Sequence, residues 1–204
     1  MENQKTQHSM SLGLYEYLLL ISPNELVRRF AWKIKQFFTQ QYDCTKANRL
    51  SPHITVGTFL LREKLESTIV SSLERFAMTV DPFKAELDGF GSFSSQTIFL
   101  DVSNKQPFAQ LSKGSKDASA RFTSNNSHFS SNAHLTIARA MDAEQFRDAW
   151  QDWKDKSFKA SFNVNEMILL RRPFEKDKVS RFEKIATFPF GGTDPPEGQL
   201  QLQF

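Results

Sequence analysis

One order of secondary-structure elements occurs twice along this chain, and the repeat constrains the fold more than any single motif. An apolar strand pattern at 14–21 (LYEYLLLI) comes first. It is followed by a helical pattern from Glu25 to about Gln41, a strand with His53, a helical pattern over 63–78 and a strand from Phe83. The apolar strand QTIFLDVS restarts the series at 96–103.

The second series has the same components at nearly the same spacing. A weaker helical pattern at 107–121, interrupted by Gly114, precedes a strand with His134, a helical pattern at 142–156 and a strand over 158–172. His53 follows Tyr15 by 38 residues, and His134 follows Ile98 by 36. Two such units are expected to pack with approximate twofold symmetry.

The repeat predicts an α+β fold with two pseudo-symmetric halves, each an antiparallel sheet with flanking helices, around a central groove. We expect a disordered N-terminal tail at 1–13, a single bilobal domain at 14–190 with repeat units of about 14–95 and 96–172, and a C-terminal tail at 191–204. Ser22 is a candidate N-cap with Pro23 at the first helical position, and Asp142 is a candidate cap of the last helix. The stretch 179–190 would add an edge strand or close one lobe.

A histidine and a threonine recur at one spacing in the two histidine strands. His53-Ile54-Thr55 stands in SPHITVGTFL, and His134-Leu135-Thr136 stands in NAHLTIARAM, 81 residues later (134 − 53 = 81). Because strand side chains alternate between faces, each histidine shares a face with its threonine, and the apolar residues between them lie on the other. Small residues, Gly57 and Ala138, follow on the face of the histidines and leave room for a ligand.

A pair of histidines facing one groove suits phosphodiester hydrolysis. One imidazole takes a proton from water and the other gives a proton to the leaving oxygen, and the ordinary pKa of histidine allows both roles near neutral pH. Threonine hydroxyls can donate hydrogen bonds to the phosphate oxygens. This chemistry requires no metal or other cofactor.

The paired H-x-T motifs in a chain of this length resemble the two-histidine (2H) phosphoesterase superfamily. HLTIAR resembles most closely the branch of the 2'-5' RNA ligases and RNA 2',3'-cyclic phosphodiesterases, and the resemblance covers roughly residues 14–190. It implies that His53 and His134 are catalytic and that Thr55, Thr136 and Arg139 bind phosphate. Strict alternation would turn Arg139 away from the groove, so its role follows from the resemblance alone, and Thr58 is its counterpart in the first motif.

The resemblance implies an enzyme that opens RNA or nucleotide 2',3'-cyclic phosphates to 2'-phosphates, with 2'-5' ligation as the reverse reaction. We expect His53 to protonate the leaving 3'-oxygen and His134 to activate water, with the reverse assignment left open. Two alternatives remain: a binding module for RNA ends or nucleotides on the same fold, and an esterase for another cyclic phosphate or a 2'-5' linkage. The Ser- and Asn-rich stretch 112–131 is expected to shape the choice of substrate.

Other readings of these residues are less favoured by the pattern. Two structural histidines would not repeat with their threonines, and a zinc site lacks ligands at suitable spacing, with Asp88 and Asp101 poorly placed. Arg171 and Arg172 could line the groove or lie in an exposed turn. Trp150 and Trp153 fit ordinary helix packing better than a base-stacking platform.

Composition narrows the class of partner. The formal net charge is +3, which permits an anionic substrate but not a large duplex-binding surface. The single cysteine, Cys44, can form no internal disulfide, and no apolar run reaches the length of a membrane helix. We therefore expect a cytoplasmic monomer that does not bind a membrane.

Overall fold

The computed structural model describes residues 13–94, 96–123, 127–175 and 180–192, with four α-helices, two short 3₁₀ helices and nine strands among them. The predicted tails at 1–13 and 191–204 lie almost wholly outside these ranges. Gly191 and Gly192 are described, and their amides donate to the backbone carbonyls of Ala77 and Val80. Among the described residues, no helix has the length and apolarity needed to cross a membrane.

The strands form one antiparallel sheet in the order β7-β3-β4-β6-β2-β1-β8-β9, with β5 paired to β2. The strands of one half are β2 (Ile54–Arg62), β1 (Leu14–Ile21), β8 (Glu166–Pro173) and β9 (Glu183–Pro189). Those of the other are β6 (His134–Ala138), β4 (Thr97–Val102), β3 (Phe83–Phe93) and β7 (Lys159–Val164). β5 is His128–Phe129. The predicted α+β class with antiparallel strands is confirmed.

The halves of the sheet do not coincide with the two sequence repeats. Strand β3 belongs to the first repeat by sequence, but it pairs with β4 and β7 of the second. The stretch 158–172, predicted as one strand, is two strands in different halves: β7 pairs with β3, and β8 pairs with β1. The halves meet where β2 pairs with β6, the two strands that carry the H-x-T motifs.

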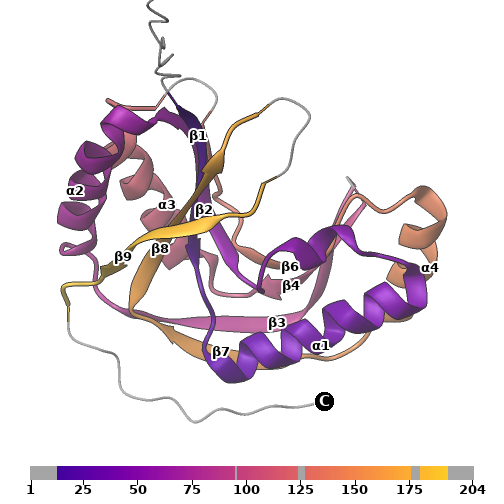
Figure 1. The fold of residues 1–204 in the computed structure, drawn as a ribbon. Coiled ribbons are helices and arrows are strands. Elements are labelled where there is room, and N and C mark those ends of the chain that lie inside the picture. The colour runs from indigo at the N-terminus through magenta and orange to yellow at the C-terminus, as the bar shows by residue number, and fades with distance from the viewer. Residues whose placement is uncertain (1–12, 95, 124–126, 176–179, 193–204) are drawn as a thin grey trace, which may run out of the picture.

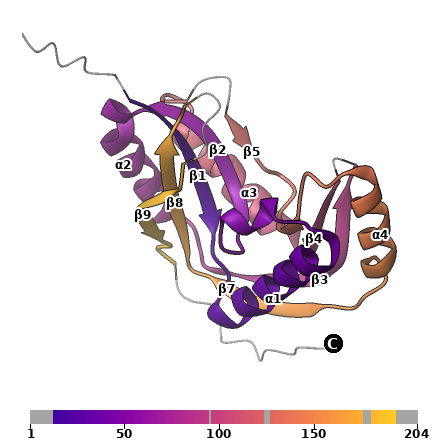
Figure 2. The same cartoon turned by 45° about the vertical axis from the view of Figure 1, so that its right-hand side comes forward.

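The two helices of each repeat lie on different halves of the sheet (Figures 1 and 2). Helices α2 (Glu66–Ala77) and α3 (Lys105–Ser119) pack together, and they contact β9 and β2. Helices α1 (Glu25–Tyr42) and α4 (Ala143–Trp153) lie on the other half, where α1 contacts β6 and β7 and α4 contacts β4. Each repeat thus contributes one helix to each half of the sheet.

Two helix starts test the predicted caps. Helix α1 begins at Glu25, and the Asn24 side chain accepts from the amide of Val27, so the prediction that Ser22 caps this helix is wrong. Asp142 caps α4 as predicted, in a capping box with Gln145. Asparagine caps a helix as well as serine does, and the sequence offered both.

The core contains the apolar faces of these helices and both faces of the central strands. Helix α1 buries Val27, Ala31, Lys35 and Phe38, while Leu26 and Phe37 are exposed. Helix α3 is regular through Gly114, where a Cβ atom would lie 2.2 Å from the Phe76 ring of α2, so the glycine permits close helix packing. Trp153 is buried against Phe38 and Phe90, as predicted for a packing residue.

Candidate active site

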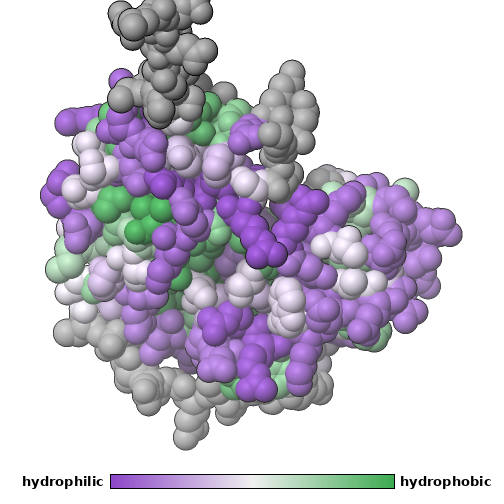
Figure 3. All heavy atoms as spheres, in the orientation of Figure 1, coloured by the Kyte–Doolittle hydropathy of each residue, from purple (hydrophilic) through white to green (hydrophobic). Residues whose placement is uncertain are grey.

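A cavity of about 830 Å³ opens at the junction of β2 and β6. Its walls come from β1, α1, the 3₁₀ helix η1 (Lys46–Arg49), β2, β6 and the β8–β9 connection. The lining residues are Glu16, Leu18, Lys35, Ala47, Asn48, Arg49, Leu50, His53, Thr55, Thr58, Thr136, Arg139, Arg172, Ser180, Arg181 and Phe182. In the space-filling view, hydrophilic residues gather between the half with β9 and the half with α4 (Figure 3). The walls therefore suit a polar, anionic ligand.

The register at the junction brings the two H-x-T motifs together. Ile54 of β2 pairs with Leu135 of β6, and both are fully buried. Because the strands are antiparallel, continuing this register by one residue sets His53 across from Thr136 and Thr55 across from His134. The threonine of each repeat thus stands beside the histidine of the other, so both repeats are needed to complete the site.

Both histidines are held by the same backbone contact. Nδ1 of His53 lies 2.8 Å from the carbonyl oxygen of Ser51, and Nδ1 of His134 lies 2.8 Å from that of Asn132. A carbonyl only accepts, so each Nδ1 carries the hydrogen and donates it. The Nε2 atom of each neutral ring is therefore free to accept a proton, and it can donate that proton once the ring is protonated.

The surroundings of the two rings differ. His53 lines the cavity, whereas His134 is not among its lining residues. The His134 ring packs edge-on against Phe93 at 4.9 Å and is tilted against Phe99 at 5.0 Å between centroids. Asp101 of β4 is the cross-strand partner of His134, and its carboxylate forms an ion pair with Lys105. His134 therefore has a carboxylate beside it.

Burial lowers the pKa of both histidines. For His53 burial is the largest cause, the positive charges of Lys35, Arg139 and His134 act in the same direction, and the pKa falls to about 4. For His134 burial again lowers the pKa and Lys105 adds to the shift, while the Asp101 carboxylate opposes it. The cationic cavity wall thus favours a neutral His53, and Asp101 favours a protonated His134.

A β-bulge follows the H-x-T motif in each strand. In β2, Leu19 pairs with Gly57 and Leu20 with Thr55, which leaves Val56 as an extra residue. In β6, Ile98 pairs with Ala138 and Phe99 with Thr136, which leaves Ile137 extra. An extra residue reverses the alternation beyond it.

These bulges decide which side chains reach the cavity. Thr58 and Arg139, which strict alternation would turn away, both line it. The bulge in β6 therefore accounts for the position of Arg139 at the cavity. Gly57 is buried instead of facing a ligand, because the Phe129 ring fills the space above it: a Cβ atom there would lie 2.4 Å from Phe129 Cδ1.

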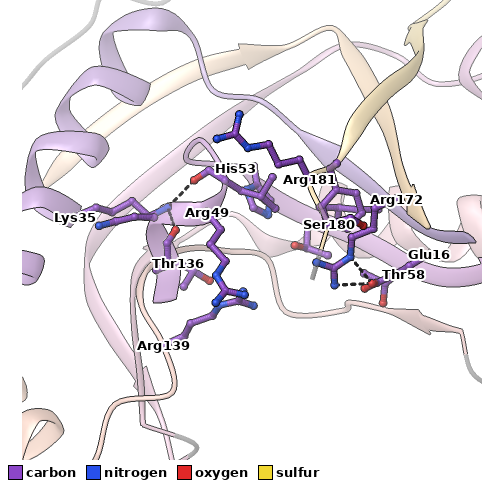
Figure 4. A pocket seen from close by; sticks show the side chains of 16 residues that line it. Glu16, Lys35, Arg49, His53, Thr58, Thr136, Arg139, Arg172, Ser180 and Arg181 are labelled. Carbon is purple, nitrogen blue, oxygen red and sulfur yellow. Dashed lines mark hydrogen bonds and ion pairs between the residues drawn. The ribbon is translucent and has the colours of Figure 1, made fainter. Parts of the chain in front are cut away.

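Lys35 is a charged wall residue that sequence reasoning missed. It is 2 % exposed, and its ammonium donates to the carbonyls of Ala47 at 2.7 Å and Leu50 at 3.1 Å (Figure 4). These bonds hold η1 and the segment that leads to His53. Burial, assisted by Arg139, lowers the pKa of Lys35 to about 8. A lysine in line with Val27, Ala31 and Phe38 on one helix face was the available signal.

Three further arginines line the cavity and were not assigned from the sequence. Arg49 comes from η1, Arg172 from β8 and Arg181 from the segment before β9 (Figure 4). Arg172 had been considered together with Arg171, but the two point to opposite faces of β8. Arg171 is tied to Glu66 at 2.6 Å and Glu183 at 2.7 Å, away from the cavity.

The remaining expectations concern the serine-rich stretch and metals. None of the described residues of 112–131 lines the cavity. Ser112 is buried and its hydroxyl donates to the carbonyl of Val56 at 3.2 Å, so it supports the β2 bulge. The described part of the chain contains no cluster of three or more His, Cys, Asp or Glu side chains able to hold a metal ion.

The comparisons with known proteins place this site in a family. Residues 23–173 match the 2'-5' RNA ligase superfamily. The match spans most of the chain, so the protein belongs to that superfamily, and the resemblance to the two-histidine phosphoesterases is confirmed. No curated protein matches the sequence.

Solved structures share the fold at low sequence identity. Escherichia coli LigT, crystallised with 3'-AMP, is 18% identical with a TM-score of 0.63, covering 87% of this chain and 98% of its own. TT0787 of Thermus thermophilus is 17% identical with a TM-score of 0.61, covering 87% and 98%. At these identities the likeness establishes the architecture alone.

Proposed function

We propose that this protein is a metal-independent phosphodiesterase that opens 2',3'-cyclic phosphates of RNA or nucleotides to 2'-phosphates. The observation that carries the proposal is the matched tethering of His53 and His134 through Nδ1, on adjacent strands, with a threonine of the opposite repeat beside each. The superfamily name and the nucleotide bound to E. coli LigT support a nucleotide or RNA substrate.

Each residue has a defined role in the proposed reaction. His134 Nε2 accepts a proton from water as the water oxygen bonds to phosphorus. The bond from phosphorus to the 3'-oxygen then breaks, and His53 Nε2 donates its proton to that oxygen, leaving a 2'-phosphate. Thr55, Thr136 and Arg139 donate to the non-bridging oxygens, where negative charge increases. With a nucleoside 5'-hydroxyl in place of water as the nucleophile, the same steps in the same direction form a 2'-5' linkage.

The electrostatic surroundings favour the resting proton on His134, so the proposed reaction proceeds through the minor form in which His53 holds that proton. Lys35 and Arg139 make the protonated form of His53 unfavourable, so it gives up its proton readily. Asp101 stabilises the positive charge that develops on His134 when it accepts one. A stronger acid and a stronger base both speed proton transfer.

An assay with adenosine 2',3'-cyclic phosphate in EDTA tests the proposal. We expect a 2'-phosphate product, and His53→Ala and His134→Ala should each reduce the rate by about 10²–10⁴-fold. His128→Ala serves as the matched control, because His128 is exposed on β5 and outside the cavity. Full activity in both alanine variants would exclude the mechanism, and tight binding without product would indicate a binding module.

A further inference from the structure

The cavity carries more positive charge than one phosphodiester needs. Five cationic side chains line it (Lys35, Arg49, Arg139, Arg172 and Arg181), against one carboxylate, Glu16. Glu16 Oε2 lies 2.7 Å from Nε and 2.6 Å from Nη2 of Arg172, so this pair is neutral overall. Lys35 is occupied with two carbonyls. Within the described ranges, Arg49, Arg139 and Arg181 have no hydrogen bond or ion pair to a protein group.

Two of these arginines converge on one point. The close-up shows the guanidinium groups of Arg49 and Arg139 directed toward each other below His53, from separate elements (Figure 4). Both side chains are exposed, so neither is forced into this position by packing. Like charges at short range repel, and an anion between them removes the repulsion while receiving hydrogen bonds from both.

The backbone around the pair is fixed in place. Lys46 Nζ donates to the carbonyl of Ala140 at 2.9 Å, which ties η1 to the end of β6 directly after Arg139. On its other side, η1 is held by the two bonds from Lys35. The start points of the two arginine side chains are therefore set before a ligand binds, which lowers the entropy lost on binding.

Arg49 is not one of the residues assigned to the reacting phosphate. The H-x-T residues that act on the scissile phosphate lie at the β2–β6 junction, whereas Arg49 comes from the 3₁₀ helix η1. Arg139 belongs to both groups and can donate to two phosphates, since a guanidinium has five N–H groups. A substrate with a second phosphate would therefore give Arg49 an anion of its own.

We propose that Arg49, together with Arg139, binds a second phosphate on the 5' side of the ribose that carries the cyclic phosphate. The preferred substrates then have at least two phosphates: an RNA 3' end with its last internal phosphodiester, or a 5'-phosphorylated cyclic nucleotide. The identity of the first phosphate rests on the function proposed above.

Equilibrium binding tests the second subsite without any turnover. Adenosine 3',5'-bisphosphate and adenosine 3'-monophosphate are titrated into the wild-type protein, Arg49→Gln and Arg147→Gln by calorimetry. We expect the bisphosphate to bind the wild type about tenfold or more tightly than the monophosphate. Arg49→Gln should reduce this ratio to near one. Arg147, an exposed arginine on α4 outside the cavity, is the control and should keep the ratio.

Two outcomes would overturn the inference. One is equal affinity of the wild type for both ligands, and the other is a ratio that Arg49→Gln leaves unchanged. Either result counts against the subsite even if the protein hydrolyses cyclic phosphates. Conversely, a clear bisphosphate preference with no hydrolysis would support the subsite and contradict the proposed function.

Kinetics then distinguish the two sources of the second phosphate. The kcat/KM for adenosine 2',3'-cyclic phosphate is compared with that of its 5'-phosphate and with that of the dinucleotide ApA ending in a cyclic phosphate. If RNA is the substrate, kcat/KM for the dinucleotide should exceed that for adenosine 2',3'-cyclic phosphate by at least as much as kcat/KM for the 5'-phosphorylated compound does. If a mononucleotide is the substrate, only the 5'-phosphorylated compound should show a higher kcat/KM. In both cases the Arg49→Gln substitution should reduce kcat/KM more for the two-phosphate substrate than for the simple cyclic nucleotide.

Discussion

Thr58 and Arg139 occupy equivalent positions in the two repeats, each the fifth residue after its histidine, and both line the same cavity. A bulge one residue after the threonine turns each of them toward it, at Val56 in β2 and at Ile137 in β6. The two repeats are therefore more alike in backbone conformation than in the side chains that they place at this position. One repeat places a hydroxyl there and the other a guanidinium, so a phosphate bound in the cavity would receive its stronger hydrogen bonds from the β6 side.

The close packing of Gly57 beneath Phe129 gives a test of the β2 bulge. Gly57→Ala should destabilise the protein by about 1–3 kcal/mol, because the new methyl group meets a ring that also stacks on Phe59. Urea unfolding measures this change. The double variant Gly57→Ala/Phe129→Leu should recover part of the loss, since the smaller side chain leaves room. Additive losses in the two single variants would mean that the clash is not the cause.

The leaving group decides which histidine is the acid. A phosphodiester with a p-nitrophenolate leaving group needs little proton donation, so the acid variant should lose less than about tenfold on it. We expect this from His53→Ala, while His134→Ala keeps its loss of about 10²–10⁴-fold. The opposite pattern would exchange the two roles. Equal losses on activated and natural substrates would contradict any division into acid and base.

Sequence reasoning singled out the proposed catalytic pair because that pair depends on local patterns. The H-x-T spacing, the alternation through Ile54 and Leu135 and the order of elements are all readable from neighbouring residues. The bulges are not, because Val56 and Ile137 are ordinary strand residues, and only the register with β1 and β4 shows one of them to be extra. The resemblance to a known family could therefore predict that Arg139 faces the cavity, whereas the alternation of side chains along a strand could not.

The rest of the cavity wall depends on topology. Arg172 and Arg181 are far from the motifs in sequence, and they meet Arg49, which stands four residues before His53, only because β8 pairs with β1 and η1 lies beside β6. The division of 158–172 into two strands was also missed, although the buried alternation changes phase at Asn165, from even-numbered residues in β7 to odd-numbered residues in β8. Local periodicity identifies elements, whereas strand partners come from long-range packing.

The pH dependence of kcat/KM should show two limbs. The reactive state holds one proton on the histidine pair, so activity rises as pH increases through the lower pKa and falls through the higher one. The rising limb belongs to His53, whose pKa lies at about 4. We assign the falling limb to His134, because Asp101 counteracts the effect of burial there.

Opposite charge changes beside His134 test this assignment. Asp101→Asn removes the carboxylate that favours the protonated ring, so the falling limb should move to lower pH. Lys105→Gln removes a charge that disfavours protonation, so the same limb should move to higher pH. Neither variant should shift the rising limb. A shift of the rising limb alone would show that His134 is not the group with the higher pKa.

The adjacent residues Arg171 and Arg172 should give separate effects on stability and on substrate binding. Arg171 joins β8 to α2 and β9 through Glu66 and Glu183, and Tyr17 also donates to Glu66 at 2.8 Å. Arg171→Met leaves the partly buried Glu66 carboxylate and the exposed Glu183 carboxylate without their cation, so the free energy of unfolding should fall by about 2–3 kcal/mol with KM little changed. Arg172→Met instead exposes the Glu16 carboxylate to the cavity, where it repels an anionic substrate, so KM should rise.

Urea denaturation and steady-state kinetics at a temperature where both variants are folded separate these effects. Arg147→Met is the matched control, because Arg147 makes only exposed ion pairs with Glu144 and Asp148 and should change neither quantity. A raised KM in Arg171→Met would place that residue at the substrate after all. An unchanged KM in Arg172→Met would show that the Glu16–Arg172 pair lies outside the path of the substrate.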